Sequence, residues 1–349
     1  MNSQIEMILI LISEPTIILA AWVLLSAPPP LIWVEREAYV MGTTLRISAE
    51  ATSRAAGISA IDAAFRAVRE LDGVLSTWRG DSEIARLNHA HTGTDVSLSP
   101  LLYTLLQDAA RWSRLTGGAF DPSVGPLIDA WDLRGRGRIP DETTLKQARA
   151  AVGMRQFVFA DGTRTARRRH SAAWLDTGGF GKGVALAHAR DALLRAGVGT
   201  ATLNFGGQVL VMGAGPAKGD WTVPVAHPSH RDQPAAWLHF HDRSASTSSQ
   251  SERFVTVRGR RVGHVLDPRS GYPVPAWGSV TVIAEDPTVA DAVSTALLVL
   301  GPEDGMRWAR GRDDVAVLFL IWRGGRLERR WNSALEQFLV ADSTLLRGA

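Results

Sequence analysis

Apolar residues recur at helical spacing in the first half of the chain. Residues 58–75 carry an apolar side chain every three or four positions, which predicts an amphipathic helix. Residues 99–118 predict a second helix, because a serine stands at the cap position, a proline follows in the first turn and glycines come after the end. Further helices are expected over 81–88, 141–153, 180–196 and 288–300.

Strand-like patterns begin at residue 37 and dominate after residue 156. Residues 37–48 alternate apolar and polar positions, which is the period of a half-buried strand. Turn residues such as Arg258-Gly259 separate several later runs and predict hairpins. Because helices gather early and strands late, the order predicts an α+β fold rather than regular βαβ alternation. Strands are expected over 156–160, 173–175, 200–204, 208–212, 221–226, 236–241, 253–257, 262–266, 279–284 and 315–322.

The first 35 residues differ from the rest. Residues 7–33 are strongly apolar, but Glu14-Pro15 interrupts them and three prolines close them. The uninterrupted run 16–25 is too short to cross a bilayer alone, and no basic residue precedes Arg36, as a secretory signal would require. We expect a signal or membrane anchor over 1–35, with a misassigned start or a buried N-terminal element as the alternatives. No repeat or low-complexity linker divides residues 37–340, which predicts one catalytic domain there.

The amino-acid composition excludes several kinds of site and partner. The 349-residue chain contains no cysteine, which excludes disulfides, zinc-thiolate sites, iron–sulfur clusters, thiol catalysis and a lipid-modified cysteine. Its net charge is only +3, and the arginine cluster at 164–170 has no aromatic residues between its charges. No nucleic-acid partner is therefore expected.

A glycine-rich loop, GGFGKG at 178–183, precedes the helix expected from residue 180. The phosphate loop of nucleotide hydrolases has the pattern G-x-x-x-x-G-K-[ST]. Here Asp176 stands in place of its first glycine and Gly183 in place of its hydroxyl residue, so the pattern fails at both ends. Free amides at a helix start still favour an anion. The loop therefore indicates either a phosphate site of another kind or an ordinary strand-to-helix turn.

Two further groups could carry chemistry. His264 and Asp267 flank a sharp turn, and imidazole is the side chain best suited to take a proton near neutral pH. Asp291 and Thr295 stand four apart on one face of the helix expected over 288–300. Their oxygen atoms suit Mg²⁺ rather than zinc. A turn-capping aspartate beside a strand-end histidine, and an acidic first helical turn, are the structural alternatives.

Eight motifs follow one another along the chain: MGTT (41–44), STWRGDSEIARLN (76–88), GGAFDPSVGPL (117–127), LDTGGFGKG (175–183), NFGG (204–207), STSSQSER (246–253), HVLDPRSGYP (264–273) and ADAVSTALLVLG (290–301). In this order and spacing they resemble the FAD:protein FMN transferase family, also called ApbE. The resemblance covers residues 37–301. It departs from the family near Ser249 and Ser251, where a glycine and a tyrosine are usual, and it lacks the lipoprotein cysteine of many members.

The resemblance implies a two-lobed catalytic domain with mostly antiparallel sheets and flanking helices. It also implies metal-dependent transfer of FMN from FAD to a Ser or Thr of a partner flavoprotein, with release of AMP. The partner would be a membrane respiratory subunit, and the enzyme would act at the periplasmic side of the inner membrane. An FAD pyrophosphatase that uses water, and a flavin-binding protein without turnover, are the alternatives.

By motif matching, the resemblance also implies roles for individual residues. His264 would activate the acceptor hydroxyl. Gly179 (through its carbonyl), Asp291 and Thr295 would hold Mg²⁺, or Mn²⁺ in its place. Eight residues would line the FAD site: Met41, Trp78, Ala119, Phe120, Asp121, Asp176, Lys182 and Val265. Because simple flavin binding needs no metal, the pair of Asp291 and Thr295 argues against a protein without turnover.

Overall fold

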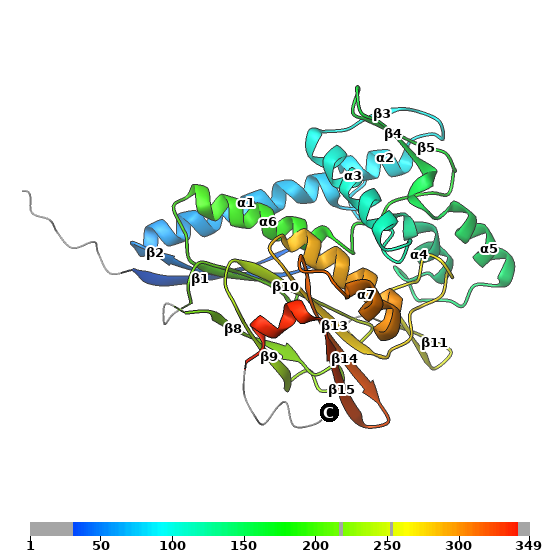
Figure 1. Ribbon diagram of the computed structural model, residues 1–349. Coiled ribbons are helices and arrows are strands. Elements are labelled where there is room, and N and C mark those ends of the chain that lie inside the picture. The colour runs from blue at the N-terminus through cyan, green and yellow to red at the C-terminus, as the bar shows by residue number, and fades with distance from the viewer. Residues whose placement is uncertain (1–30, 216–218, 252–253, 341–349) are drawn as a thin grey trace, which may run out of the picture. The chain divides into compact units, whose positions relative to one another are not determined.

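The computed structural model describes residues 31–215, 219–251 and 254–340 (Figure 1). The segment expected to be a signal or anchor lies outside these residues, except for its last five positions. Strand β1 (Ile32–Val40) already begins at Ile32, so residues 32–35 belong to the folded unit and the boundary expected at 35–37 falls inside a strand. Within the described ranges, no helix is long and apolar enough to cross a membrane.

One eight-stranded sheet forms the centre of the fold, and every neighbouring pair of its strands is antiparallel. Its order is β1-β2-β6-β7-β10-β13-β14-β15. The expected α+β class with mostly antiparallel strands is confirmed. The other strands of this sheet are β2 (Thr43–Ala51), β6 (Ala201–Phe205), β7 (Gln208–Met212), β10 (Arg243–Ser249), β13 (Gly278–Ala284), β14 (Ala316–Arg323) and β15 (Arg326–Trp331).

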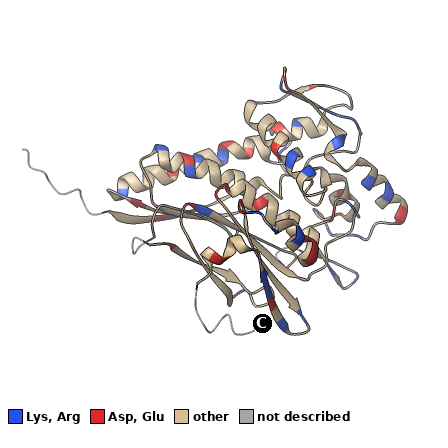
Figure 2. Cartoon of the chain, in the orientation of Figure 1, with Lys and Arg blue, Asp and Glu red and all other residues tan. Residues whose placement is uncertain are grey.

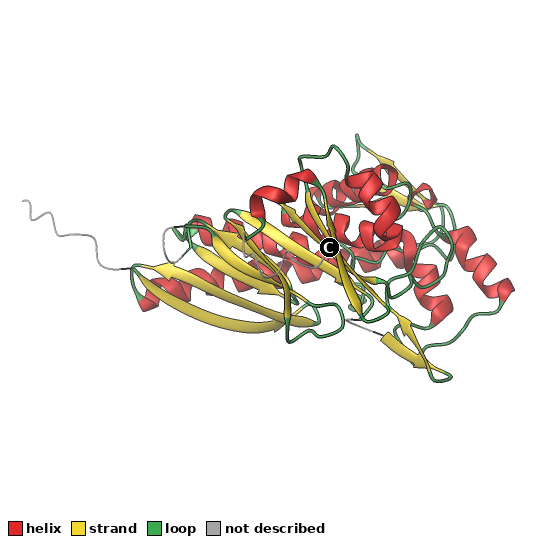
Figure 3. Ribbon diagram, turned by 60° about the horizontal axis from the view of Figure 1, so that its bottom comes forward, coloured by secondary structure: helices red, strands yellow, loops and turns green. Residues whose placement is uncertain are grey.

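Three long helices cover one face of this sheet: α1 (Arg54–Leu75), α6 (Gly181–Arg195) and α7 (Pro287–Ala309) (Figures 1 and 3). The hairpin of β8 (Trp221–Ala226) and β9 (Pro234–Phe240) packs on the other face with the 3₁₀ turn η3 (Ser333–Phe338). Every residue of β13 is buried, because both of its faces are covered. Acidic and basic residues are interspersed along α1, as expected of a solvated outer face (Figure 2).

A second group of elements follows α1 in the chain. It contains α2 (Glu83–His89), α3 (Pro100–Leu115), α4 (Gly125–Trp131) and α5 (Glu142–Ala151). A small sheet joins β3 (Val96–Ser97), β5 (Thr165–Arg168) and β4 (Phe157–Ala160), and a separate hairpin joins β11 (Phe254–Val257) to β12 (Arg260–Gly263). The predicted helix over 99–118 is confirmed as α3, with the Ser99 hydroxyl accepting from the Leu102 amide.

One expected strand needs correction. The run 173–175, expected as a strand, pairs with no strand in the part of the chain that the structure describes. The side-chain amide of Asn88 replaces the missing strand, because it donates to the Leu175 carbonyl and accepts from the Leu175 amide at 2.9 and 2.8 Å. The helix expected over 288–300 is confirmed as the first part of α7. At Gly301 the backbone leaves the helical conformation with a φ of 76°, and a second helical segment continues from Pro302 to Ala309.

Candidate active site

Hydrogen bonds hold the glycine-rich loop 176–183, whose last three residues begin α6. The Asp176 amide donates to the Pro122 carbonyl at 2.7 Å, and the Asp176 carboxylate accepts from the Gly178 amide at 2.9 Å. The Thr177 hydroxyl donates to the carbonyl of Leu75, the last residue of α1, at 2.9 Å. These bonds fix the backbone of the loop, so the amides at the start of α6 have a defined direction.

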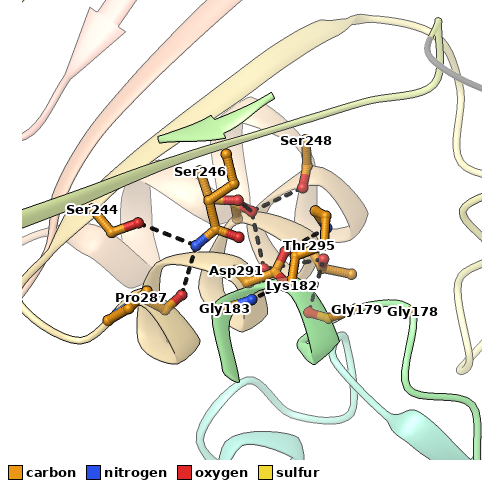
Figure 4. Close-up of polar contacts among 12 residues, drawn as sticks. Gly178, Gly179, Lys182, Gly183, Ser244, Ser246, Ser248, Pro287, Asp291 and Thr295 are labelled. Atoms are coloured by element: carbon orange, nitrogen blue, oxygen red, sulfur yellow. Dashed lines mark hydrogen bonds and ion pairs between the residues drawn. The ribbon is translucent and has the colours of Figure 1, made fainter. Parts of the chain in front are cut away.

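An ion pair joins this loop to α7 (Figure 4). The Lys182 ammonium lies 2.9 Å from Oδ1 of Asp291, and the Gly183 amide donates to Oδ2 of the same carboxylate at 3.0 Å. The Asp291 side chain is 2% exposed, whereas that of Lys182 is 33% exposed. A buried carboxylate of this kind needs a positive partner, because an unpaired buried charge is strongly destabilising.

Close packing explains why Gly183 carries no side chain. A Cβ there would lie 2.6 Å from Thr288 Cα and against the Pro287 carbonyl, which are backbone atoms of the first turn of α7. The buried Gln208 amide holds that Pro287 carbonyl at 2.8 Å and the Ser244 hydroxyl at 3.2 Å. The serine or threonine of a phosphate-loop hydrolase cannot fit at this position. The loop therefore differs from a phosphate loop in having no hydroxyl residue after its lysine.

Oxygen atoms from two elements converge beside the ion pair. The Thr295 hydroxyl lies 3.4 Å from the Gly179 carbonyl oxygen and 3.1 Å from the Asp291 carbonyl oxygen, one turn earlier in α7. Hydroxyl, carbonyl and carboxylate oxygens are the ligands that Mg²⁺ prefers, and Lys182 shows that a positive charge is accommodated against Asp291. The three residues expected to hold the metal are therefore neighbours, and their chemistry fits a hard divalent cation.

No group of three or more His, Cys, Asp or Glu side chains that could hold a metal occurs in the described ranges. A cation bound at Asp291 would thus have at most two ligands of these kinds from the described residues. Mg²⁺ usually keeps several waters and takes substrate phosphate oxygens as further ligands, so this scarcity is typical of a site that binds a metal together with a phosphorylated substrate.

Buried and partly buried serine hydroxyls fix α7 on β10 beside this site. Ser294 donates to the Asp291 carbonyl at 3.0 Å. The hydroxyls of Ser246 and Ser248 lie 3.1 and 2.9 Å from the Ser294 hydroxyl, within hydrogen-bond distance. Since Ser294 satisfies the Asp291 carbonyl, the neighbouring Thr295 hydroxyl is not required for that purpose and can turn its lone pairs towards a cation.

Arg134 joins the expected FAD residues Trp78 and Asp176, although no motif in the sequence marks it. Its guanidinium donates to Oδ1 of Asp176 at 2.7 Å and to the Thr77 carbonyl at 3.0 Å. Its central carbon lies 4.4 Å from the ring centroid of Trp78 and 4.6 Å from that of Trp174, within the range of cation–π contacts. Trp78 remains 74% exposed, so its ring can stack on a planar ligand.

The segment 117–121 contacts both the loop and the 264–273 turn. The Phe120 and Phe180 rings pack edge to face at 6.2 Å, and a Cβ at Gly179 would lie 3.2 Å from the Phe120 ring. On the other side, a Cβ at Gly118 would lie 3.7 Å from the Arg269 side chain. Ala119 is buried in the hydrophobic cluster against which Val265 also packs. Phe120 therefore packs against the glycine-rich loop, and Ala119 lies in the same cluster as Val265.

Asp121 and Met41 occupy different surroundings from each other. The Asp121 carboxylate is 9% exposed and accepts from the Ser123 amide, the Ser123 and Ser113 hydroxyls and the Met154 amide. These four donors satisfy its lone pairs, which leaves its backbone as the part able to meet a ligand. Met41 lies in the turn between β1 and β2, and a Cβ at Gly181 would be 3.7 Å from its methyl group.

His264 follows β12 and is exposed. Its neighbour Val265 is held through the backbone by the buried Gln250 side chain, which accepts from the Val265 amide at 3.0 Å and donates to the Val274 carbonyl at 2.9 Å. The Asp267 carboxylate makes two bonds to the Arg269 guanidinium, at 2.9 and 3.0 Å, and these bonds raise the pKa of Arg269 above its ordinary value. The Asp267 carboxylate is therefore engaged by Arg269 within the 264–273 turn.

Comparison with known proteins shows the family to which the chain belongs. The family model described as the ApbE family matches residues 41–319. Proteins named FAD:protein FMN transferase from Klebsiella pneumoniae and Treponema pallidum are each 30% identical to the chain. Their alignments cover 73% and 82% of this chain and 80% and 84% of those proteins, respectively.

Two solved structures resemble the structure of this chain over most of its length. The ApbE protein of Thermotoga maritima superposes with a TM-score of 0.80 at 28% identity and covers 88% of this chain and 100% of its own. The flavin transferase ApbE of Vibrio cholerae gives a TM-score of 0.77 at 26% identity and covers 89% of this chain and 100% of its own.

Proposed function

The chain belongs to the ApbE family and is an FAD:protein FMN transferase, and from this premise we propose that it uses one divalent cation and releases AMP. The observation that carries the proposal is the convergence of the Asp291 carboxylate, the Thr295 hydroxyl and the Gly179 carbonyl beside Lys182. When bound there, Mg²⁺ or Mn²⁺ would neutralise charge on the pyrophosphate of FAD and help to align it.

The proposed reaction exchanges one bond to phosphorus for another. The hydroxyl oxygen of an acceptor Ser or Thr attacks the phosphorus on the FMN side of the pyrophosphate. The bond from that phosphorus to the bridging oxygen breaks, and the bridging oxygen leaves with AMP. The hydroxyl proton passes to His264, and the product is a phosphoester of FMN on the acceptor protein.

The residues of this chain hold and orient the FAD in the proposed complex. The Lys182 ammonium and the amides at the start of α6 offer positive charge and donors to the pyrophosphate. The exposed Trp78 ring, braced by Arg134, offers a flat apolar face to one of the two ring systems of FAD. Phosphoryl transfer depends mainly on positioning and charge neutralisation, and this set of groups is suited to both.

The acceptor is proposed to be a flavoprotein subunit of a membrane respiratory complex, modified on a Ser or Thr. An enzyme that meets such a subunit would act at the periplasmic side of the inner membrane. The exposure of His264 supports a protein acceptor, because a base that serves an incoming macromolecule must be reachable from outside.

Metal dependence can be tested with Asp291→Asn and a matched control. Asp286→Asn removes the same charge from the N-cap of α7, and asparagine caps helices as well as aspartate does. We expect AMP release by the wild type to stop in EDTA and to return with Mg²⁺. Asp291→Asn should show no return at any Mg²⁺ concentration, whereas Asp286→Asn should behave like the wild type. AMP release by Asp291→Asn at limiting Mg²⁺ with the wild-type rate would refute the metal assignment.

A further inference from the structure

The Lys182 ammonium contacts the Asp291 carboxylate oxygen to which a cation would bind. Oδ2 of Asp291 accepts from the Gly183 backbone amide, which the packing of α6 on α7 holds in place. Oδ1 accepts from the Lys182 ammonium at 2.9 Å (Figure 4). With the carboxylate 2% exposed, one oxygen atom remains for an exchangeable partner, and the lysine holds it.

We propose that Lys182 and the divalent cation compete for Oδ1 of Asp291, and that cation binding thereby releases the lysine to the pyrophosphate of FAD. This inference rests on the proposed role of Asp291 as a metal ligand. The lysine is then a positioning residue that couples the two binding events. Its side chain is one-third exposed and flexible, so it can leave Asp291 without unfolding its surroundings.

Electrostatics determines the direction of the coupling. A dication and an ammonium on the same carboxylate oxygen repel each other, so each excludes the other. Either of them alone keeps the buried carboxylate neutralised, whereas losing both would leave an unpaired buried charge. FAD without a cation must therefore draw Lys182 away from Asp291 and bring its own negative charge beside that carboxylate. A bound cation takes the place of Lys182 on Asp291 and also offsets the negative charge that FAD brings beside the carboxylate.

Thermodynamic linkage gives the consequence. If a cation raises the affinity for FAD by some factor, FAD raises the affinity for the cation by the same factor. Removing the ammonium removes the competitor of the cation. A variant without the lysine charge should thus bind the cation more tightly when FAD is absent, although it loses a contact to FAD.

Lys182→Met tests this directly, with Lys146→Met as the matched control. Lys146 is exposed on α5, so its loss changes the net charge equally and leaves the site untouched. Binding of Mn²⁺ at pH 8 without FAD is measured by the electron paramagnetic resonance signal of free Mn²⁺. We expect Lys182→Met to bind Mn²⁺ about 5–150-fold more tightly than the wild type, which is the usual range of such couplings. Lys146→Met should match the wild type.

Thermal unfolding supplies a second readout. Without metal, Lys182→Met should melt below the wild type, because Asp291 has lost its counter-charge, and Mn²⁺ should raise its Tm by more than that of the wild type. Equal or weaker Mn²⁺ binding by a folded Lys182→Met, or by Lys182→Gln, overturns the inference. If the wild type binds no Mn²⁺, or if Asp291→Asn binds it unchanged, the proposed metal site itself fails, which is a different result.

Discussion

At the scale of single residues, His264 is the group proposed to take the proton of the acceptor hydroxyl. General-base help is typically worth about 10²–10⁴-fold in rate, so His264→Ala should reduce FMN transfer by a factor in that range. FAD and Mn²⁺ affinities should remain nearly unchanged, because neither ligand depends on the imidazole. The measurement is the single-turnover rate of acceptor labelling at saturating FAD.

The pH dependence supplies the control for this prediction. A base must be unprotonated to act, so the wild-type rate should rise as the pH passes upward through the pKa of the histidine, and the variant should lose that rise. If Asp291 were the base instead, His264→Ala would keep the pH dependence of the wild-type rate, and its main defect would be weaker FAD binding. Labelling by His264→Ala at the wild-type rate across the range would remove the histidine from the mechanism.

Some of the site could be predicted from residue spacing, and some could not. Asp291 and Thr295 lie four apart, so a helix puts them on one face whatever the rest of the fold does. Lys182 lies 109 positions before Asp291, and no local pattern connects the two. Arg134 likewise reaches Trp78 and Asp176 only through the tertiary fold, and the arginines around it in sequence conceal it.

At the scale of elements, the packing of α6 on α7 sets the distance between Lys182 and Asp291. Gly183→Ala would push a methyl group into the backbone of Pro287 and Thr288, which cannot move as a side chain can. Overpacking of this kind costs about 1–3 kcal/mol of stability. We expect a lower free energy of unfolding in urea, together with weaker Mn²⁺ binding because α7 is displaced.

Gly73→Ala is the matched control for this change. Gly73 lies inside α1, and a Cβ there would meet no atom within 4 Å. Alanine at such a position should stabilise the helix by about 0.5–1 kcal/mol. If Gly183→Ala were as stable as the wild type, the close contact of α6 with α7 would not be what excludes a side chain at 183.

Element boundaries were predictable where capping residues mark them. Ser99 and Asp141 cap α3 and α5 with side-chain bonds to the backbone, and both helices were expected there. The seven-residue α4 was missed, because it is too short for a helical period to show and has no side-chain cap, whereas Ser82 caps the equally short α2. The strand expected over 173–175 failed for another reason: its partner is the side chain of Asn88, and strand patterns do not reveal a side-chain partner.

At the scale of the whole molecule, the folded unit includes residues before the expected boundary. Val34 is 5% exposed and packs beside Gly57 of α1, and the Trp33 ring meets the Trp221 ring edge to face at 5.7 Å. A chain that begins at Leu31 should bind FAD like the full-length protein. A chain that begins at Arg36 should melt a few degrees lower, because burying a valine contributes about 1.5–3 kcal/mol.

Thermal unfolding and FAD titration of the two truncated chains check this prediction. Loss of FAD binding in the chain from Leu31 would mean that the first thirty residues contribute to the site. Equal Tm values for the two chains would mean that residues 31–35 add no stability to the sheet.

We propose that the chain moves FMN from FAD to a protein hydroxyl with the help of a divalent cation. The most direct measurement combines the intact mass of an acceptor flavoprotein with the amount of AMP formed, with and without Mg²⁺. The acceptor should be one that a related FAD:protein FMN transferase labels in a parallel reaction, so that a negative result has meaning.

We expect the acceptor to gain the mass of FMN less one water, on a Ser or Thr, with one AMP for each adduct and only when Mg²⁺ is present. Free FMN and AMP beside an unmodified acceptor would instead show that water takes the phosphoryl group. Labelling that proceeds equally in EDTA would contradict the role assigned to Asp291, Thr295 and Gly179.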